Sequence, residues 1–322
     1  MTGNGLYLPS LEPATRHFLD QLALGGTFPL AGRSAASVRA VLTNLQSGPT
    51  GKPTVDIEDT ALPVGPTGVL PARIVRPKNI LGSLPVVMFF HGGGWVAGDM
   101  HTHDRLVREI SIAVPAAVVL VGFGLSPEAH FPVAIEEAYA ATAYVVNNGR
   151  ALRVDGTRLA VVGDGTGGNM AAAVTIMSKQ RRGPKIAFQV LFYPPTAVNF
   201  EAGSYLDHRN GPWLTRQDME WLWNAYLPKG NDRANVLATP LSATVDQLRG
   251  LPDALLITAE IDVLRDEGES YARKLQEAYV RTTCTRYIGT IHDFVMLDAL
   301  ADTPAARGAV AQAVVALRSA LA

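Results

Sequence analysis

Continuous apolar runs dominate the chain beyond residue 80, and polar segments with helical spacing separate them. Five such runs are bounded by turn residues: LPVVMFF, AAVVLVG, RLAVVG, IAFQVLFYP and DALLITAE. Runs of this kind are typical of parallel strands buried on both faces. Helix-like spacing is found between them, over 103–114, 135–147, 166–177 and 267–278. This alternation predicts an α/β fold with a mostly parallel, twisted central sheet flanked by helices.

Two shorter patterns precede the apolar runs. The first 50 residues are expected to be mostly helical, since Phe18, Leu19 and Leu22 share one helical face. Residues Thr54–Glu58 and Leu70–Val75 alternate between apolar and polar side chains. That alternation predicts an antiparallel strand pair.

Between Pro195 and Pro252 the alternation of strands and helices is interrupted. This stretch holds three of the four tryptophans, Trp213, Trp221 and Trp223. It can be a packed surface helix, or a lid whose aromatic side chains line a pocket. We favour the lid, because ligand sites in open α/β sheets lie beyond the carboxyl ends of the strands, where this insertion emerges.

Composition narrows the class of protein. The 322 residues are 48% hydrophobic and 18% charged, so the chain needs neither disulfide nor metal to fold. A net charge of −1 argues against a nucleic-acid partner. The single cysteine, Cys284, excludes an intrachain disulfide and fits a reducing, cytoplasmic compartment. No signal-peptide pattern is expected, and Pro115 interrupts the longest apolar stretch, so we expect no membrane span.

Two glycine-rich segments follow buried runs directly. His91-Gly92-Gly93-Gly94-Trp95 comes after LPVVMFF, and its glycines allow a sharp turn with exposed N–H groups. Such a loop can form an oxyanion hole, although a plain tight turn has the same residues. The segment 163–169, GDGTGGN, follows RLAVV and opens a helix.

The context of GDGTGGN is that of a nucleophile elbow, G-x-S-x-G, but the central residue is Gly165 instead of serine. No other G-x-S-x-G occurs in the chain. Gly163, Gly165 and Gly168 also match the dinucleotide spacing G-x-G-x-x-G. That interpretation is weaker, because the segment lies in the middle of the sheet and no suitable acidic residue follows about 20 residues on.

An acid and a histidine complete the pattern. Asp262 follows the run DALLITAE, and His292 follows the strand-like TRYI. Alone, Asp262 could cap a helix and His292 could be a buried loop residue. The order of elbow, acid and histidine is that of α/β-hydrolases.

Five motifs together resemble the hormone-sensitive-lipase-like family of the α/β-hydrolase fold: HGGGW, SPEAHFPVAIEEAYAA, GDGTGGN, DVLRDEG and IHDF. The resemblance extends from about residue 50 to the C-terminus, and the N-terminal helices are similar to that family's cap. It implies a helical cap over 1–45 and 198–238 and a catalytic domain over 50–197 and 239–322. It also implies hydrolysis of a small carboxylic ester, or a related carbonyl compound, without cofactor or metal.

The resemblance assigns roles to single residues. Asp262 and His292 are the acid and the base, and Gly165 stands at the nucleophile position. The expected oxyanion donors are the N–H groups of Gly93, Gly94 and Thr166. The substrate pocket is expected to include His91, Gly92, Trp95, Asp164, Trp213 and Trp223.

The departures from the family concern the site itself. Gly165 replaces the serine, Thr166 replaces the usual alanine, and Gly122-Phe123-Gly124-Leu125 replaces D-Y-R-L. Without the hydroxyl, ordinary esterase activity is expected to be very low. Three interpretations stay open: an ester hydrolase scaffold lacking its nucleophile, a lyase, dehydratase or cyclase that uses His292 as base, and a ligand-binding pseudoenzyme.

Two further features are ambiguous. His101 and His103 have H-x-H spacing but no third ligand nearby, so we expect no metal site. The apolar C-terminal helix, 309–321, is expected to pack in the core, with a homodimer face as the alternative.

Overall fold

A single eight-stranded sheet organises the chain. The computed structural model describes residues 10–25, 30–48, 50–80 and 82–322. The strands lie in the order β1-β2-β4-β3-β5-β6-β7-β8. Their bounds are Val55–Leu62, Leu70–Pro77, Leu84–Phe90, Ala117–Val121, Val154–Asp164, Phe188–Phe192, Asp253–Ile261 and Thr282–Ile291 for β1 to β8.

The sheet confirms the predicted fold class. β1 pairs with β2 and β2 with β4 in antiparallel register, whereas β4, β3, β5, β6, β7 and β8 are parallel neighbours. β3 and β4 are buried along their whole length, as expected for strands covered on both faces. Cys284 lies in β8.

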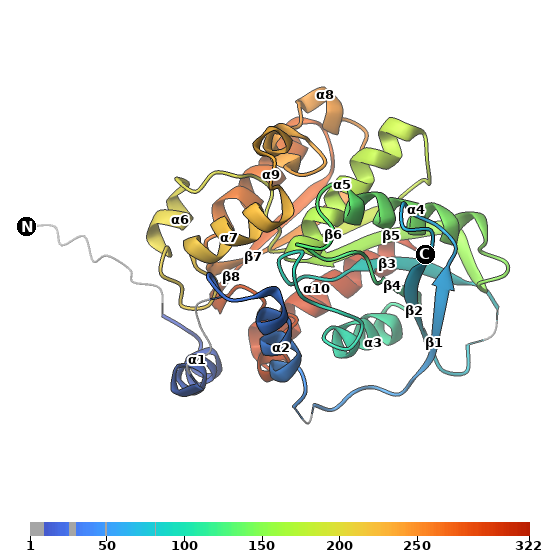
Figure 1. Cartoon of the computed structure of the whole chain (residues 1–322). Coiled ribbons are helices and arrows are strands. Elements are labelled where there is room, and N and C mark those ends of the chain that lie inside the picture. Colours follow the sequence, from blue (N-terminus) through green and yellow to red (C-terminus); the bar gives the residue numbers. More distant parts are fainter. Residues whose placement is uncertain (1–9, 26–29, 49, 81) are drawn as a thin grey trace, which may run out of the picture.

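Helices cover both faces of the sheet. In Figure 1, α3 (Asp104–Ala113) and α10 (Pro304–Ala320) lie on one side of it, and α4 (Val133–Asn147), α5 (Thr166–Arg181) and α9 (Arg265–Glu277) lie on the other. α10 contacts α3 and strands β5 to β8, so its buried apolar residues pack against the sheet. Within the described ranges, no helix is long and apolar enough to cross a membrane.

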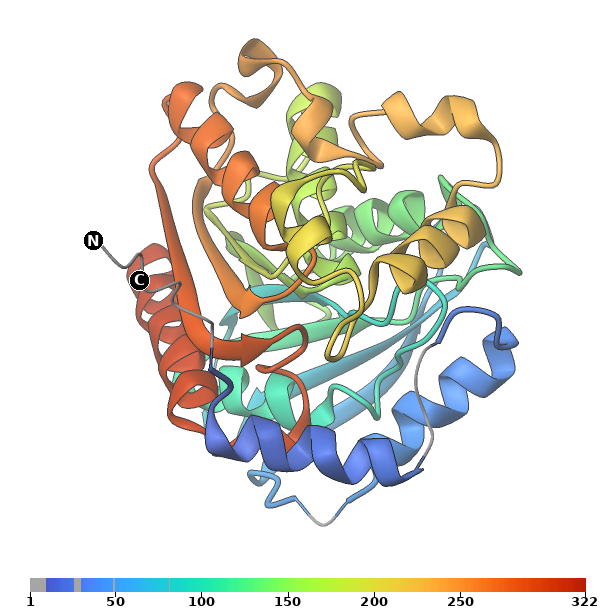
Figure 2. The same cartoon turned by 90° about the vertical axis from the view of Figure 1, so that its left-hand side faces the viewer.

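Four of the remaining α-helices belong to the two segments of the predicted cap, and α8 lies beyond its second segment. α1 (Pro13–Gly25) and α2 (Ala35–Leu45) form the N-terminal segment. α6 (Gly203–Asp207) and α7 (Arg216–Tyr226) lie in the insertion between β6 and β7, followed by α8 (Val245–Leu248). Figure 2 shows both segments on the side of the molecule that faces the viewer. Residues 1–9 and 26–29 of the predicted cap lie outside the described residues.

Direct contacts join the two cap segments. The ring of Phe18 in α1 lies 5.5 Å from the ring of Trp213, centroid to centroid. The backbone N–H groups of Leu30 and Ala31 both donate to Oδ1 of Asp218, at 2.8 Å each. Asp218 also forms a capping box with Thr215 at the start of α7. One buried carboxylate therefore fixes the start of α7 and holds the N-terminal segment against it.

Candidate active site

Four of the five sequence motifs meet at one edge of the sheet. β3, β5, β7 and β8 are parallel strands, so their carboxyl ends point to the same edge. His91, Gly165, Asp262 and His292 each lie within one residue beyond the end of one of these strands. Residues separated by up to about 200 positions in sequence are brought together in this way.

Gly165 forms a sharp turn between β5 and α5. Its backbone has φ of 50° and ψ of −122°, a conformation that L-amino acids with a side chain rarely adopt. Its N–H donates to the Phe192 carbonyl at 2.9 Å, and its carbonyl accepts from Gly168 and Asn169. Two residues on, a side chain at Gly167 would collide with the backbone of Phe90 in β3. The glycines of this motif thus serve a strained turn and close strand–helix packing, which is the geometry of a nucleophile elbow.

His292 lies beside this turn and is oriented by Asp262. Its Nδ1 is 2.8 Å from Oδ2 of Asp262, which is fully buried with its other oxygen accepting from the Leu264 N–H. A Cβ placed on Gly165 would lie 3.3 Å from Nε2 of His292. The elbow position and the far nitrogen of an aspartate-bound histidine are therefore in direct contact.

The charge state of His292 is set by its neighbours. Burial lowers the pKa of the imidazole, but the negative charges of Asp293 and Asp262 and the hydrogen bond to Asp262 outweigh it and raise the pKa to about 9. The charge of Asp164 acts in the same direction. At neutral pH the ring is therefore an imidazolium.

The predicted oxyanion donors line the same cavity. Gly93 and Gly94 have φ of 106° and 70°, and together with Thr166 they are part of the cavity wall. Across the described ranges, the N–H groups of Gly93 and Gly94 have no protein acceptor. Thr166 is the first residue of α5, where N–H groups lack an intrahelical acceptor and the helix dipole favours negative charge. Its hydroxyl also accepts from the Trp95 N–H at 3.3 Å, which ties the glycine loop to the elbow.

A second buried histidine–aspartate pair lies underneath. Asp164 accepts from the Gly92 N–H at 3.1 Å through Oδ1, and its Oδ2 is 3.2 Å from Nε2 of His103. Nδ1 of His103 is 2.9 Å from the Thr102 hydroxyl. Burial lowers the pKa of His103, but Asp164 outweighs it and the pKa is raised. This pair holds the glycine loop to the end of β5 and does not reach the cavity.

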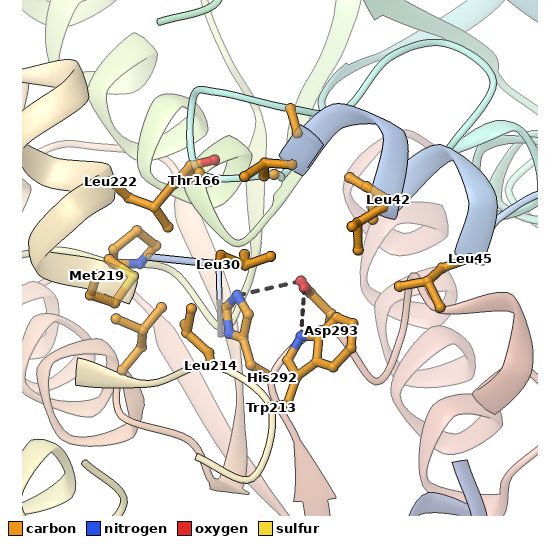
Figure 3. A pocket seen from close by; sticks show the side chains of 17 residues that line it. Leu30, Leu42, Leu45, Thr166, Trp213, Leu214, Met219, Leu222, His292 and Asp293 are labelled. Atoms are coloured by element: carbon orange, nitrogen blue, oxygen red, sulfur yellow. Dashed lines mark hydrogen bonds and ion pairs between the residues drawn. The ribbon is translucent and has the colours of Figure 1, made fainter. Parts of the chain in front are cut away.

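The cavity is mainly apolar and lies between the two segments of the predicted cap and the edge of the sheet that carries His292. Figure 3 shows Leu214 and Met219 on one side of His292, Trp213 and Asp293 on the other side, and Leu42 and Leu45 of α2 beyond Asp293. The other lining residues are Leu30, Val38, Val41, Gly93, Gly94, Ala97, Thr166, Pro195, Leu222 and Leu264. Of the six residues predicted for the substrate pocket, Trp213 is part of this wall.

The other five predicted pocket residues lie elsewhere: His91, Gly92, Trp95, Asp164 and Trp223. The rings of Trp95 and Trp223 are fully buried against each other, 4.5 Å apart. On α7, Met219 and Leu222 share the face toward the cavity, while Trp223 and Tyr226 share the next face, toward Trp95.

Phe123, in the segment that departs from the family pattern, packs against His91. The two rings stack at 4.3 Å with an angle of 16° between their planes. Nδ1 of His91 lies 2.8 Å from the Gly92 carbonyl, and burial followed by the charge of His103 lowers the pKa of His91 to about 4. A neutral His91 is therefore a packing residue beneath the glycine loop.

Asp293 is a site residue that the sequence analysis missed. It lines the cavity, and its Oδ1 is 3.3 Å from Nε2 of His292 (Figure 3). Its Oδ2 accepts a hydrogen bond from Nε1 of Trp213 at 3.1 Å. The only signal in the sequence was its place next to His292 in IHDF, where a backbone φ of 65° turns the side chain toward the cavity.

Comparisons with known proteins agree with this geometry. Residues 87–296 match a family model described as alpha/beta hydrolase fold. The chain is similar to Carboxylesterase NlhH of Mycobacterium tuberculosis, with 33% identity over 100% of this chain and 99% of the relative.

Solved structures of esterases are similar over nearly the whole chain. A thermostable esterase from Pseudomonas putida ECU1011 has a TM-score of 0.94 and 43% identity, covering 98% of this chain and 99% of that one. A hyperthermophilic esterase from Pyrobaculum calidifontis has a TM-score of 0.87 and 36% identity, covering 96% and 98%. The relatives support an activity of the carboxylesterase type, and the chain belongs to the α/β-hydrolase fold family.

Proposed function

We propose that the chain is a carboxylic-ester hydrolase scaffold of the hormone-sensitive-lipase type whose elbow serine is replaced by Gly165. Asp262 and His292 are the acid and base of this site, and Gly93, Gly94 and Thr166 are its oxyanion donors. The observation that carries the proposal is the 3.3 Å between His292 Nε2 and a Cβ placed on Gly165. A serine hydroxyl at the elbow would be within hydrogen-bond reach of the oriented imidazole.

The missing hydroxyl removes the acyl-enzyme route. In a serine protease, loss of the serine lowers kcat about 10⁶-fold, and about 10³–10⁴-fold catalysis over water persists from the oxyanion hole and binding. We therefore expect this chain to turn over ordinary esters very slowly. The cavity and the hydrogen bond between Asp262 and His292 do not depend on the serine.

The proposed substrate is a small, mainly apolar ester. Leucine, valine, methionine and tryptophan side chains from residues 30–45 and 213–222 form most of the cavity wall. We propose that residues 1–45 and 198–238 act as the cap that selects the substrate, with 50–197 and 239–322 as the catalytic domain. The hydrogen bonds from Leu30 and Ala31 to Asp218 support a cap that works as one unit.

The hydrogen bond between Asp262 and His292 weighs against a pure binding protein, which has no need for it. The raised pKa of His292, about 9, does not separate a lyase or cyclase from the serine route, because both need a neutral imidazole as general base. The relatives and the solved structures that resemble the chain are esterases, and this favours the hydrolase scaffold.

The test is the variant Gly165→Ser, assayed beside the parent chain on p-nitrophenyl butyrate. We expect ester hydrolysis to rise by several orders of magnitude, because acid, base and oxyanion donors are already placed. The double variant Gly165→Ser/His292→Ala is the matched control and should lose the gain. A Gly165→Ser rate within tenfold of the parent would contradict the proposal.

A further inference from the structure

The carboxylate of Asp293 contacts the nitrogen of His292 that a serine would use. Its Oδ1 is 3.3 Å from Nε2, while Nδ1 of the same ring is held by Asp262. The side chain of Asp293 otherwise touches the cavity and accepts the Trp213 hydrogen bond. The imidazole is thus bracketed by two carboxylates, and one of them belongs to the cavity wall (Figure 3).

The elbow position lies within reach of both partners of this contact. A Cβ on Gly165 would be 3.3 Å from His292 Nε2 and 3.9 Å from Asp293 Oδ1. In a chain with glycine at this position, a water molecule can take the place of the side chain, because it would have at least two polar partners. Such a water would lie at the mouth of the proposed oxyanion hole.

We propose that Asp293 and His292 form an acid–base pair that hydrolyses an ester by direct attack of water, without an acyl-enzyme. The proposal rests on the proposed function, since it needs an ester in this cavity. It adds a catalytic residue, Asp293, and a route that the residues of this chain can support.

The step balances without any further reactant. Asp293 accepts one proton from the water while the water oxygen bonds to the acyl carbon, and the carbonyl oxygen takes up the negative charge. The N–H groups of Gly93, Gly94 and Thr166 stabilise that charge. The tetrahedral intermediate then expels the alcohol oxygen, which receives the Nε2 proton of His292. A proton moves from Asp293 to His292 across their contact, and the acid and alcohol leave.

The surrounding charges favour these roles at neutral pH. His292 faces Asp262 beyond β7, Asp164 at the end of β5, Asp293 beside it and the ring of Tyr193 beyond β6. The carboxylates keep a proton on the imidazole, so it can act as an acid. For Asp293, burial raises the pKa of the carboxyl above its usual range, while His292 and the Trp213 hydrogen bond lower it. A carboxylate with a raised pKa is a stronger base toward water.

The two routes need opposite protonation of His292, and this separates them. Direct water attack needs the imidazolium, so the parent chain's rate should fall as the pH rises above about 9. The serine route needs the neutral imidazole, so the rate of Gly165→Ser should rise over the same range.

The experiment measures p-nitrophenyl butyrate hydrolysis by the parent chain from pH 6 to 10. The parent is first treated with a serine-directed phosphonate, which inactivates trace serine esterases. Gly165→Ser is assayed without this treatment. Asp293→Asn should lower the parent's phosphonate-resistant rate by at least about tenfold. The exposed, matched control Asp302→Asn should leave it unchanged. In the Gly165→Ser background, Asp293→Asn should instead raise the rate at pH 7, because the imidazole loses one of the charges that keep it protonated.

The outcomes are distinguishable. If Gly165→Ser is active but the parent has no phosphonate-resistant turnover, the water route is overturned and the proposed function stays intact. The same conclusion follows if Asp293→Asn leaves the parent's phosphonate-resistant turnover unchanged. An inactive Gly165→Ser overturns the proposed function itself. If Asp293→Asn does not fold, the pH profile of the parent decides alone: a rate that climbs steadily through pH 9 as in the serine variant contradicts the proposal.

Discussion

In the part of the chain that the structure describes, two histidines are each paired with a buried aspartate beyond or at the end of a strand, and the two pairs differ in their surroundings. Asp164 with His103 and Asp262 with His292 have similar contact distances, 3.2 Å and 2.8 Å. In the first pair the second nitrogen meets the Thr102 hydroxyl inside the protein. In the second pair it meets the cavity and the elbow. The two pairs thus share residue types and burial. They differ in what the second imidazole nitrogen contacts, and this makes Asp164–His103 a structural pair and Asp262–His292 the pair proposed for catalysis.

The largest expected difference between the pairs is in catalysis. In the Gly165→Ser background, His292→Ala should lower kcat by about 10⁴–10⁶-fold, as for other catalytic histidines. His103→Ala, the matched change in the other pair, should cost less than about 100-fold, since it acts only through the glycine loop. Steady-state kinetics on p-nitrophenyl butyrate measure both. Equal losses would remove the distinction between the pairs.

A smaller effect is expected on stability from the structural pair. Asp164→Ala leaves the Gly92 N–H and Nε2 of His103 without the buried carboxylate that both contact. Each buried polar group left unsatisfied typically lowers the free energy of unfolding by about 1–3 kcal/mol. Urea denaturation of parent and variant measures the loss, and a midpoint equal to the parent's would show that the pair does not hold the loop.

Protonation of His292 should make the stability of the fold depend on pH. The folded-state pKa of His292, about 9, lies above the ordinary histidine value of about 6.5, so the bound proton stabilises the folded state. This stabilisation is complete below about pH 6.5 and is lost as the pH rises through 9. A shift of this size corresponds to about 3 kcal/mol.

The matched comparison for that prediction is His292→Gln, whose side chain does not titrate. The difference in unfolding free energy between parent and variant should shrink steadily between pH 6.5 and 9.5. A difference that stays constant over this range would mean that the two carboxylates do not hold a proton on His292.

The fold and the pair of Asp262 and His292 could be predicted from the sequence, because both depend on where the strands end. Apolar runs located the strands, and parallel strands place Gly165, Asp262 and His292 at one edge wherever the loops lie. The strained turn was recognisable because its glycines occur at fixed spacing after a strand.

Side-chain direction was harder to predict. Asp164 precedes Gly165 by one residue, and successive strand residues point to opposite faces, so it lies under the elbow instead of in the cavity. Trp223 is one position from Leu222, yet on a helix that rotates it away from the cavity wall. The side chain of Asp293 points to the cavity because its backbone has a positive φ, which the sequence around it does not predict.

The central claim is that the site lacks only a hydroxyl, and active-site labelling tests it most directly. A p-nitrophenyl phosphonate should add one covalent phosphonyl group to Gly165→Ser, at the introduced serine, as read by mass spectrometry of the intact chain and its peptides. The parent chain and Gly165→Ser/His292→Ala should stay unlabelled under the same conditions. An unlabelled but folded Gly165→Ser, or equal labelling with and without His292, would contradict the account.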